Sequence, residues 1–140
     1  MGEATEPLPE RQPPLVLRKV PPERQQLARS MTARGADGKG GIWWELVDAA
    51  APPELPAVAV ALTRDGAGGC VTVSALGVMH ADAWEEYAEL LRGLVAALRR
   101  HAVDAVVIHA VDRVVASAVV EVGFRHAPDS NGGDRYLIVL

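Results

Sequence analysis

The sequence has little of what many specialised small proteins depend on. Its single cysteine, Cys70, excludes an internal disulfide bond and a cysteine-based metal site, and suits a reducing compartment. No apolar run of about 18 residues predicts a membrane-spanning helix, and the N-terminal stretch has no apolar segment typical of a secretion signal. Lys and Arg number 14 against 18 Asp and Glu, which argues against nucleic acid or an anionic membrane as a partner. We therefore expect a cytoplasmic protein.

The length of 140 residues is typical of one domain. A chain of this size buries roughly 68–70% of the surface that its unfolded state exposes, so a substantial core is available. Residues 1–14 carry four prolines among charged residues and are predicted to be a disordered tail. Residues 15–140 are then expected to form a single domain.

The first part of this domain alternates short apolar runs with turn residues. Strands are predicted over residues 15–20, 42–47, 56–63 and 69–79, and a helix over residues 23–31 after Pro21 and Pro22. Short turns join the last three of these strands, which indicates an antiparallel meander. Residues 82–101 show the clearest helical periodicity, with one apolar stripe made of Trp84, Tyr87, Leu91, Leu94 and Leu98.

The C-terminal part contains one ambiguous segment. Val106, Val107 and Ile108 predict a buried strand, and residues 134–140 predict a last one. Between them, the valines of Arg113–Val122 favour a strand by propensity but also recur at helical spacing. We interpret this segment as a helix, because Asp112 can cap its start, Gly123 can adopt a left-handed conformation after its end, and parallel strands need a crossover.

This order of elements, closed by Gly123-Phe124-Arg125 and a last strand, resembles the GNAT (Gcn5-related) N-acetyltransferase superfamily. The resemblance covers residues 15–140 and implies an α/β (α+β) fold, with a mixed, mostly antiparallel twisted sheet flanked by helices. It also implies transfer of an acyl group from acetyl-CoA or another acyl-CoA to the amine of a small molecule or a protein. In the family, the end of the fourth strand pairs with the pantetheine arm of CoA. The resemblance therefore implies that Gly77, Val78 and Met79 bind the cofactor here.

At the positions where the family carries its cofactor-binding loop and its proton donor, this sequence has residues of other types. Its phosphate-binding loop would lie at Asp82, Glu85 and Tyr87, where Asp82 and Glu85 instead resemble a helix-capping pair. The Tyr that commonly acts as proton donor is replaced by Val119. The family's Asn seven residues earlier is replaced by Asp112, which the resemblance implies as a cofactor-binding position. An alternative is therefore a GNAT-like fold that has lost CoA and acts as a binding or dimerisation module.

Two side chains are candidate catalytic bases. His109 ends the strand beside which the family's acyl group lies, so it can be a general base, although a partly buried, hydrogen-bonded histidine is the favoured interpretation. Glu45 lies beside Trp43 and Trp44, where it can act as a base or receive a cationic acceptor. Cys70 lies in a predicted strand and is interpreted as a small core residue.

The tryptophan pair also bears on association. Because side chains alternate along a strand, Trp43 and Trp44 cannot both face one core, which leaves one indole for a ligand, a loop or a partner subunit. A homodimer is expected on this basis. The histidines show no spacing typical of metal ligands, so no metal site is predicted.

Overall fold

The computed structural model describes residues 15–32, 39–79, 84–109, 113–128 and 134–140. The strands of these ranges are β1 (Leu15–Lys19), β2 (Ile42–Asp48), β3 (Ala59–Asp65), β4 (Cys70–Val78), β5 (Ala105–His109), β6 (Arg125–His126) and β7 (Arg135–Val139). The α-helices are α1 (Gln25–Ser30), α2 (Trp84–Arg99) and α3 (Arg113–Val122), and short 3-10 turns cover Pro22–Arg24 and Ala67–Gly69.

All strands belong to one seven-stranded sheet in the order β1-β2-β3-β4-β5-β7-β6. The β4–β5 pair is parallel, and the other neighbours are antiparallel. A parallel pair needs a crossover, and α2 supplies it between β4 and β5. The predicted fold class, a mixed and mostly antiparallel sheet flanked by helices, is confirmed.

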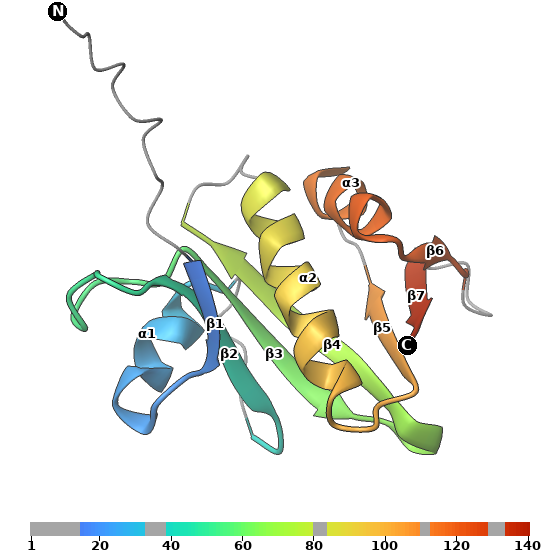
Figure 1. The fold of residues 1–140 in the computed structure, drawn as a ribbon, viewed down its shortest axis with the longest axis horizontal. Coiled ribbons are helices and arrows are strands. Elements are labelled where there is room, and N and C mark those ends of the chain that lie inside the picture. Colours follow the sequence, from blue (N-terminus) through green and yellow to red (C-terminus); the bar gives the residue numbers. More distant parts are fainter. Residues whose placement is uncertain (1–14, 33–38, 80–83, 110–112, 129–133) are drawn as a thin grey trace, which may run out of the picture.

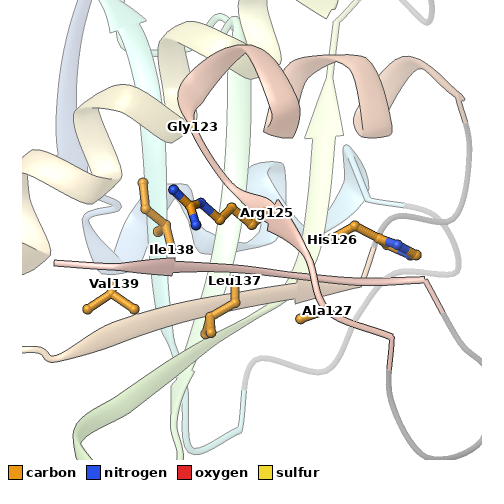
Figure 2. Close-up of a pocket in the computed structure, with 7 residues that line it drawn as sticks. All are labelled: Gly123, Arg125, His126, Ala127, Leu137, Ile138 and Val139. Carbon is orange, nitrogen blue, oxygen red and sulfur yellow. The ribbon is translucent and has the colours of Figure 1, made fainter.

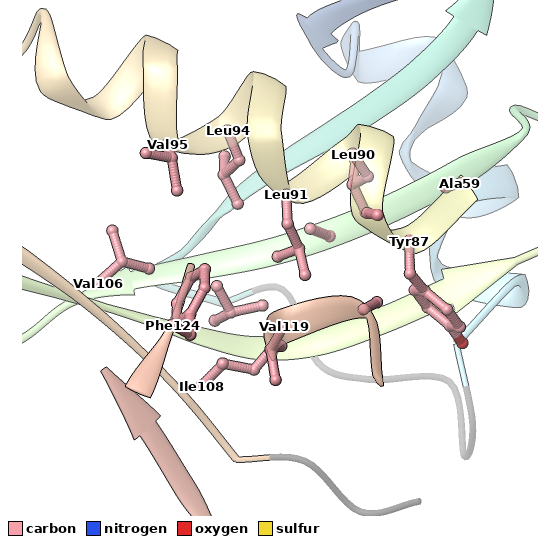
Figure 3. Packing of buried hydrophobic residues seen from close by; sticks show 14 of the residues in the cluster. Ala59, Tyr87, Leu90, Leu91, Leu94, Val95, Val106, Ile108, Val119 and Phe124 are labelled. Carbon is pink, nitrogen blue, oxygen red and sulfur yellow. The ribbon is translucent and has the colours of Figure 1, made fainter. Parts of the chain in front are cut away.

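Helices α2 and α3 lie side by side across one face of the sheet, and α1 lies at its β1–β2 side (Figure 1). The larger core cluster fills the space beneath α2 and α3. Figure 3 shows Leu90, Leu91 and Leu94 of α2 pointing toward the strands, with Val119 of α3 and Phe124 beside them. None of the described helices is long and apolar enough to cross a membrane.

A second, smaller cluster covers the opposite face of β2 and β3. It contains Trp43 and Val60 together with Ala28 of α1, whereas Trp44 belongs to the larger cluster. The two indoles therefore point to opposite faces, as the alternation predicts. Both are only 5% exposed, because α1 and its flanking residues cover Trp43 within the same chain. Neither indole of the Trp43-Trp44 pair is left for a partner, so this argument for a homodimer was wrong, and the homodimer itself stays a prediction.

Most predicted elements agree with the structure within a few residues, and the exceptions have local causes. The helix predicted over residues 23–31 begins as a 3-10 turn, and α1 covers only Gln25–Ser30. The third strand begins at Ala59 rather than at residue 56, after a loop that contains Pro52, Pro53 and Pro56. The two-residue strand β6 was missed, since a strand this short has no periodicity.

The ambiguous segment is a helix over Arg113–Val122, as predicted, and Gly123 after it has a φ of 114°, a conformation that favours glycine. The expectation that this helix crosses over between parallel strands was wrong, because β5 and β7 pair in antiparallel orientation. On α2, the predicted stripe is buried at Tyr87, Leu91, Leu94 and Leu98 but not at Trp84, which is 38% exposed. Trp84 opens the helix, where periodicity alone cannot tell whether other elements cover it. The predicted caps Asp82 and Asp112 and the predicted tail lie outside the described residues.

The core beneath α2 yields a stability prediction. Leu91 is fully buried in the larger cluster, so Leu91→Ala is expected to lower the free energy of unfolding by about 2–5 kcal/mol, through lost transfer energy and a residual cavity. Val120 on α3 is 59% exposed, and Val120→Ala should change the free energy of unfolding by less than about 0.5 kcal/mol. Urea denaturation of both variants measures the difference, and equal effects would contradict the packing described.

Candidate functional site

The sheet opens between β4 and β5. The two strands pair only from Cys70 and Ala105 to Val73 and Ile108, whereas β4 continues along β3 to Val78. At the point where the strands separate, β4 carries one extra residue: Leu62 pairs with Ala75 and Thr63 pairs with Val73, which leaves Ser74 as a bulge. Within the described residues, the second half of β4 therefore has a strand partner on one side only.

The direction of the backbone groups follows from the hydrogen bonds of β3. The N–H of Met79 donates to the carbonyl oxygen of Val58, at 3.0 Å. Backbone groups alternate in direction along an antiparallel strand, so those of Gly77 and Met79 point toward β3 and those of Leu76 and Val78 point toward the opening. Of the predicted cofactor-binding residues Gly77, Val78 and Met79, Val78 is thus the one whose amide and carbonyl face the opening.

Gly77 has a structural role of its own. A Cβ atom at this position would lie 2.7 Å from the carbonyl carbon of Met31 and closer still to the Met31 oxygen. Only glycine lets the end of α1 approach β4 this closely. Met79, just beyond the end of β4, is 48% exposed. The predicted cofactor role of these residues stays a prediction.

His109 ends β5 at the same opening. It pairs with Arg135 of β7 in the sheet register, and it follows Ile108, whose side chain is buried under α2 and α3. By alternation, His109 belongs to the opposite face of the sheet. Its side chain is exposed rather than partly buried, so the expectation of a half-buried histidine was wrong, and the imidazole is accessible to a ligand.

Glu45 lies in a buried ion cluster, which we define as Glu45, Arg24 and Arg18. The carboxylate of Glu45 is 1% exposed; its Oε1 accepts from Nη2 of Arg24 at 2.9 Å, and its Oε2 accepts from Nε of Arg18 at 2.8 Å. Arg24 also donates from Nε to both carboxylate oxygens and from Nη1 to the carbonyl of Pro53. A carboxylate held this way joins β1, β2 and the residues before α1, and these contacts favour a structural role over that of a base.

The start of α2 is acidic, with Glu85 and Glu86 in its first turn. A helix N-terminus attracts anions through its free amides, but carboxylates beside it oppose a phosphate. Tyr87, at the last of the positions where the family carries its loop, is buried in the core. Asp82 and the predicted cofactor residue Asp112 lie outside the described residues.

The remaining candidates have ordinary surroundings. Cys70 is half-buried at the start of β4. In the ranges that the structure covers, no group of three or more His, Cys, Asp or Glu side chains could hold a metal ion. His126 contacts Asp134 at 3.2 Å and packs against Tyr136, which links β6 to the start of β7.

A hollow of about 590 Å³ lies at the β6–β7 edge. Figure 2 shows that Ile138 and Val139, which both line it, point to opposite sides of β7, with Arg125 on the side of Ile138. The hollow therefore extends over both faces of the sheet at this edge, and the side chains that line it do not point toward a common centre. It carries no catalytic arrangement.

The sequence matches no protein-family model and no curated protein. Solved structures with the same arrangement exist, however. The IAA acetyltransferase from Bacillus cereus ATCC 14579 is 13% identical, with a TM-score of 0.65, over 91% of this chain and 100% of that one. The Bacillus subtilis acetyltransferase in complex with CoA is 11% identical, with a TM-score of 0.65, over 90% of this chain and 97% of that one. A GCN5-related N-acetyltransferase from Kribbella flavida is 14% identical, with a TM-score of 0.64, over 90% of this chain and 98% of that one.

The chain has the GNAT fold. Its structural neighbours cover 90–91% of the chain, so the likeness is not confined to the C-terminal Gly123-Phe124-Arg125 signature. At these identities the likeness concerns the fold alone. In this GNAT fold, Phe124 is buried in the core and Arg125 begins β6, so the signature joins α3 to the edge of the sheet.

Sequence reasoning missed the ion cluster. Arg18 and Arg24 lie 27 and 21 positions from Glu45, and no local pattern links them. The register of β1 with β2, which pairs Arg18 with Glu45, is the one signal that could have indicated it.

The ion cluster yields a second stability prediction. Arg24→Met leaves the buried Glu45 carboxylate without its bidentate partner and should cost about 3–5 kcal/mol of unfolding free energy. The double variant Arg24→Met with Glu45→Leu should recover part of this loss, because no charge is then left buried. Arg18→Met is the control: its side chain is 45% exposed, so the cost should stay below about 1 kcal/mol. Equal costs for the two single variants would contradict the assigned roles.

Proposed function

We propose that the protein is an acyltransferase that transfers an acyl group from acyl-CoA to an amine, with the opening between β4 and β5 as its acyl-donor site. The observation that carries the proposal is the separation of these strands after Val73 and Ile108, beside the Ser74 bulge. Three acetyltransferase structures share this fold over nine-tenths of the chain, and one of them contains CoA.

The opening suits an extended chain that carries amide groups. The backbone groups of Leu76 and Val78 point into it, and such groups pair readily with the amides of another extended segment. The pantetheine arm of CoA is a segment of this kind. When bound, acyl-CoA would supply the activated thioester carbonyl, and the backbone groups of Leu76 and Val78 would hold its pantetheine arm.

The start of α2 fits the phosphates of CoA less well. Glu85 and Glu86 place negative charge where other helices of this type present free amides to an anion. One carboxylate about 6 Å from a phosphate charge costs roughly 3 kcal/mol at an effective dielectric of ~20, before salt screening weakens it. We therefore infer that acetyl-CoA binds weakly and is held through its pantetheine arm.

His109 is the base that we assign to the reaction. It lies at the end of β5 beside the opening, and its exposed imidazole can take a proton from the ammonium form of the acceptor. The free amine would then attack the thioester carbonyl, so that the new C–N bond replaces the C–S bond and CoA leaves as the thiolate. The predicted role of Glu45 as a base stays a prediction, but its oxygens already accept from two guanidinium groups. The acceptor is an amine of a small molecule or a protein.

A second candidate function rests on the acidic start of α2. A GNAT fold that has lost CoA would keep the sheet and the core but serve as a binding or dimerisation module. Carboxylates in the first turn of α2 favour this alternative, because they oppose the polyanionic donor. Binding of acetyl-CoA separates the two functions directly.

Calorimetric titration with acetyl-CoA tests the donor site. The wild type is expected to bind weakly, and Glu85→Gln should tighten binding up to about tenfold, which corresponds to ~1.4 kcal/mol. Glu89→Gln, an exposed carboxylate one turn further along α2, is the matched control and should change little. Tight binding by the wild type would contradict the repulsion, and absence of binding by all three proteins would favour the non-catalytic module.

Steady-state kinetics with acetyl-CoA and a panel of amines tests the base. His109→Ala is expected to lower kcat by roughly 10²–10⁴-fold with little change in KM for the donor, and added imidazole should restore part of the rate. His101→Ala, an exposed histidine between α2 and β5, is the control. An unchanged kcat in His109→Ala would remove this residue from the mechanism without excluding transfer.

A further inference from the structure

A second cavity lies under the β2–β3 loop and extends from Arg18 of β1 to Met79, just beyond the end of β4. Its volume is about 460 Å³, which lies within the range of small-molecule sites. Arg18, Arg24, Pro53, Leu55 and Met79 are among the residues that line it, and we call it the loop cleft. Neither the acyl-donor site nor the ion cluster's structural role requires a hollow at this place.

The charge of the loop cleft is positive at its base. Arg18 and Arg24 face a single carboxylate, that of Glu45, so the ion cluster carries one net positive charge. Asp48 also borders the cleft, but alternation along β2 places it on the opposite face from Glu45, and its Oδ1 accepts from the N–H of Ala50. Among the residues that line the cleft, Asp48 is the one carboxylate besides the ion cluster, and it lies on the other face of β2.

Arg18 keeps donors for a ligand. Its Nε donates to Glu45, and this is the one hydrogen bond of its side chain to the rest of the described chain. The side chain is 45% exposed, so the outer N–H groups of the guanidinium face the solvent at the cleft. A guanidinium held at Nε by a buried carboxylate is oriented before a ligand arrives, which suits a planar, bidentate acceptor such as a carboxylate.

The walls of the loop cleft are apolar. Leu55 and Met79 are 49% and 48% exposed, which is unusual for side chains of this size, and Pro52, Pro53 and Pro56 surround them. Apolar walls beside one cation select an apolar body with a single negative charge. A polyanion such as CoA would need more cations, and a cationic ligand would be repelled by the base of the cleft.

We propose that the loop cleft binds a small amphipathic carboxylate, whose carboxylate group pairs with the guanidinium of Arg18 and whose apolar body lies against Leu55 and Met79. The Arg18 end of this site lies on β1, with β2 and β3 between it and β4, whereas its apolar end reaches Met79 just beyond β4. Its occupancy does not depend on acyl transfer. The proposal therefore stands or falls independently of the enzymatic function.

Titration of the 15N-labelled protein with octanoate, followed by NMR at constant ionic strength, tests the site, with octan-1-ol and octylammonium as matched probes. Octanoate is expected to shift the amides of Ala51, Leu55 and Met79 and to bind at least fivefold more tightly than either of the other two probes. Equal affinity for the three probes, shifts confined to other surfaces, or no binding at 10 mM octanoate would overturn the proposal.

Variants separate the two parts of the site. Arg18→Gln should weaken octanoate at least fivefold and leave octan-1-ol unchanged, whereas Leu55→Asn should weaken both. Arg125→Gln, an exposed arginine at the β6–β7 hollow, is the matched control and should bind octanoate as the wild type does. Thermal melts confirm that each variant is folded. Octanoate binding that survives Arg18→Gln in a folded protein would overturn the assigned contact.

Discussion

The parallel pairing of β4 with β5 is the constraint on which the rest of the structure depends. Parallel neighbours cannot be joined by a tight turn, so the chain must leave the sheet and cross one face before it returns. Helix α2 makes this crossing, and its buried leucines form the centre of the larger core. Because the pairing ends at Val73 and Ile108, the same constraint also creates the opening in the sheet.

The opening and the loop cleft use different physical means of recognition. At the opening, backbone groups of β4 lack a strand partner in the described part of the chain and can pair with an extended ligand. In the loop cleft, a side-chain charge that is oriented by Glu45 lies next to apolar walls. The first arrangement relies on backbone groups, whereas the second depends on the side chains of Arg18, Leu55 and Met79.

The ion cluster explains why a conspicuous carboxylate is a poor catalytic candidate. Glu45 belongs to β2, the strand that also carries the two tryptophans, and its side chain is buried beneath the residues that cover this face of the sheet. An unpaired charge at this place would be costly. Arg24 and Arg18 satisfy its oxygens, and the carbonyl of Pro53 receives a further donor from Arg24. The cluster thereby connects the β2–β3 loop to the edge of the sheet and shapes the cleft beneath that loop.

The sequence by itself determined the order of elements, because periodicity, glycines and turn residues act locally. Arg113–Val122 was identified as a helix despite its valines, and Gly123 after its end was the valid local signal. The crossover between parallel strands that was also assumed here was wrong, because β5 and β7 are antiparallel. Only the tertiary structure decided the burial of both indoles, the exposure of His109, the approach of Met31 to Gly77 and the partners of Glu45. Each of these depends on segments that lie far apart in the chain, and the sheet register and the packing of α1 bring them together.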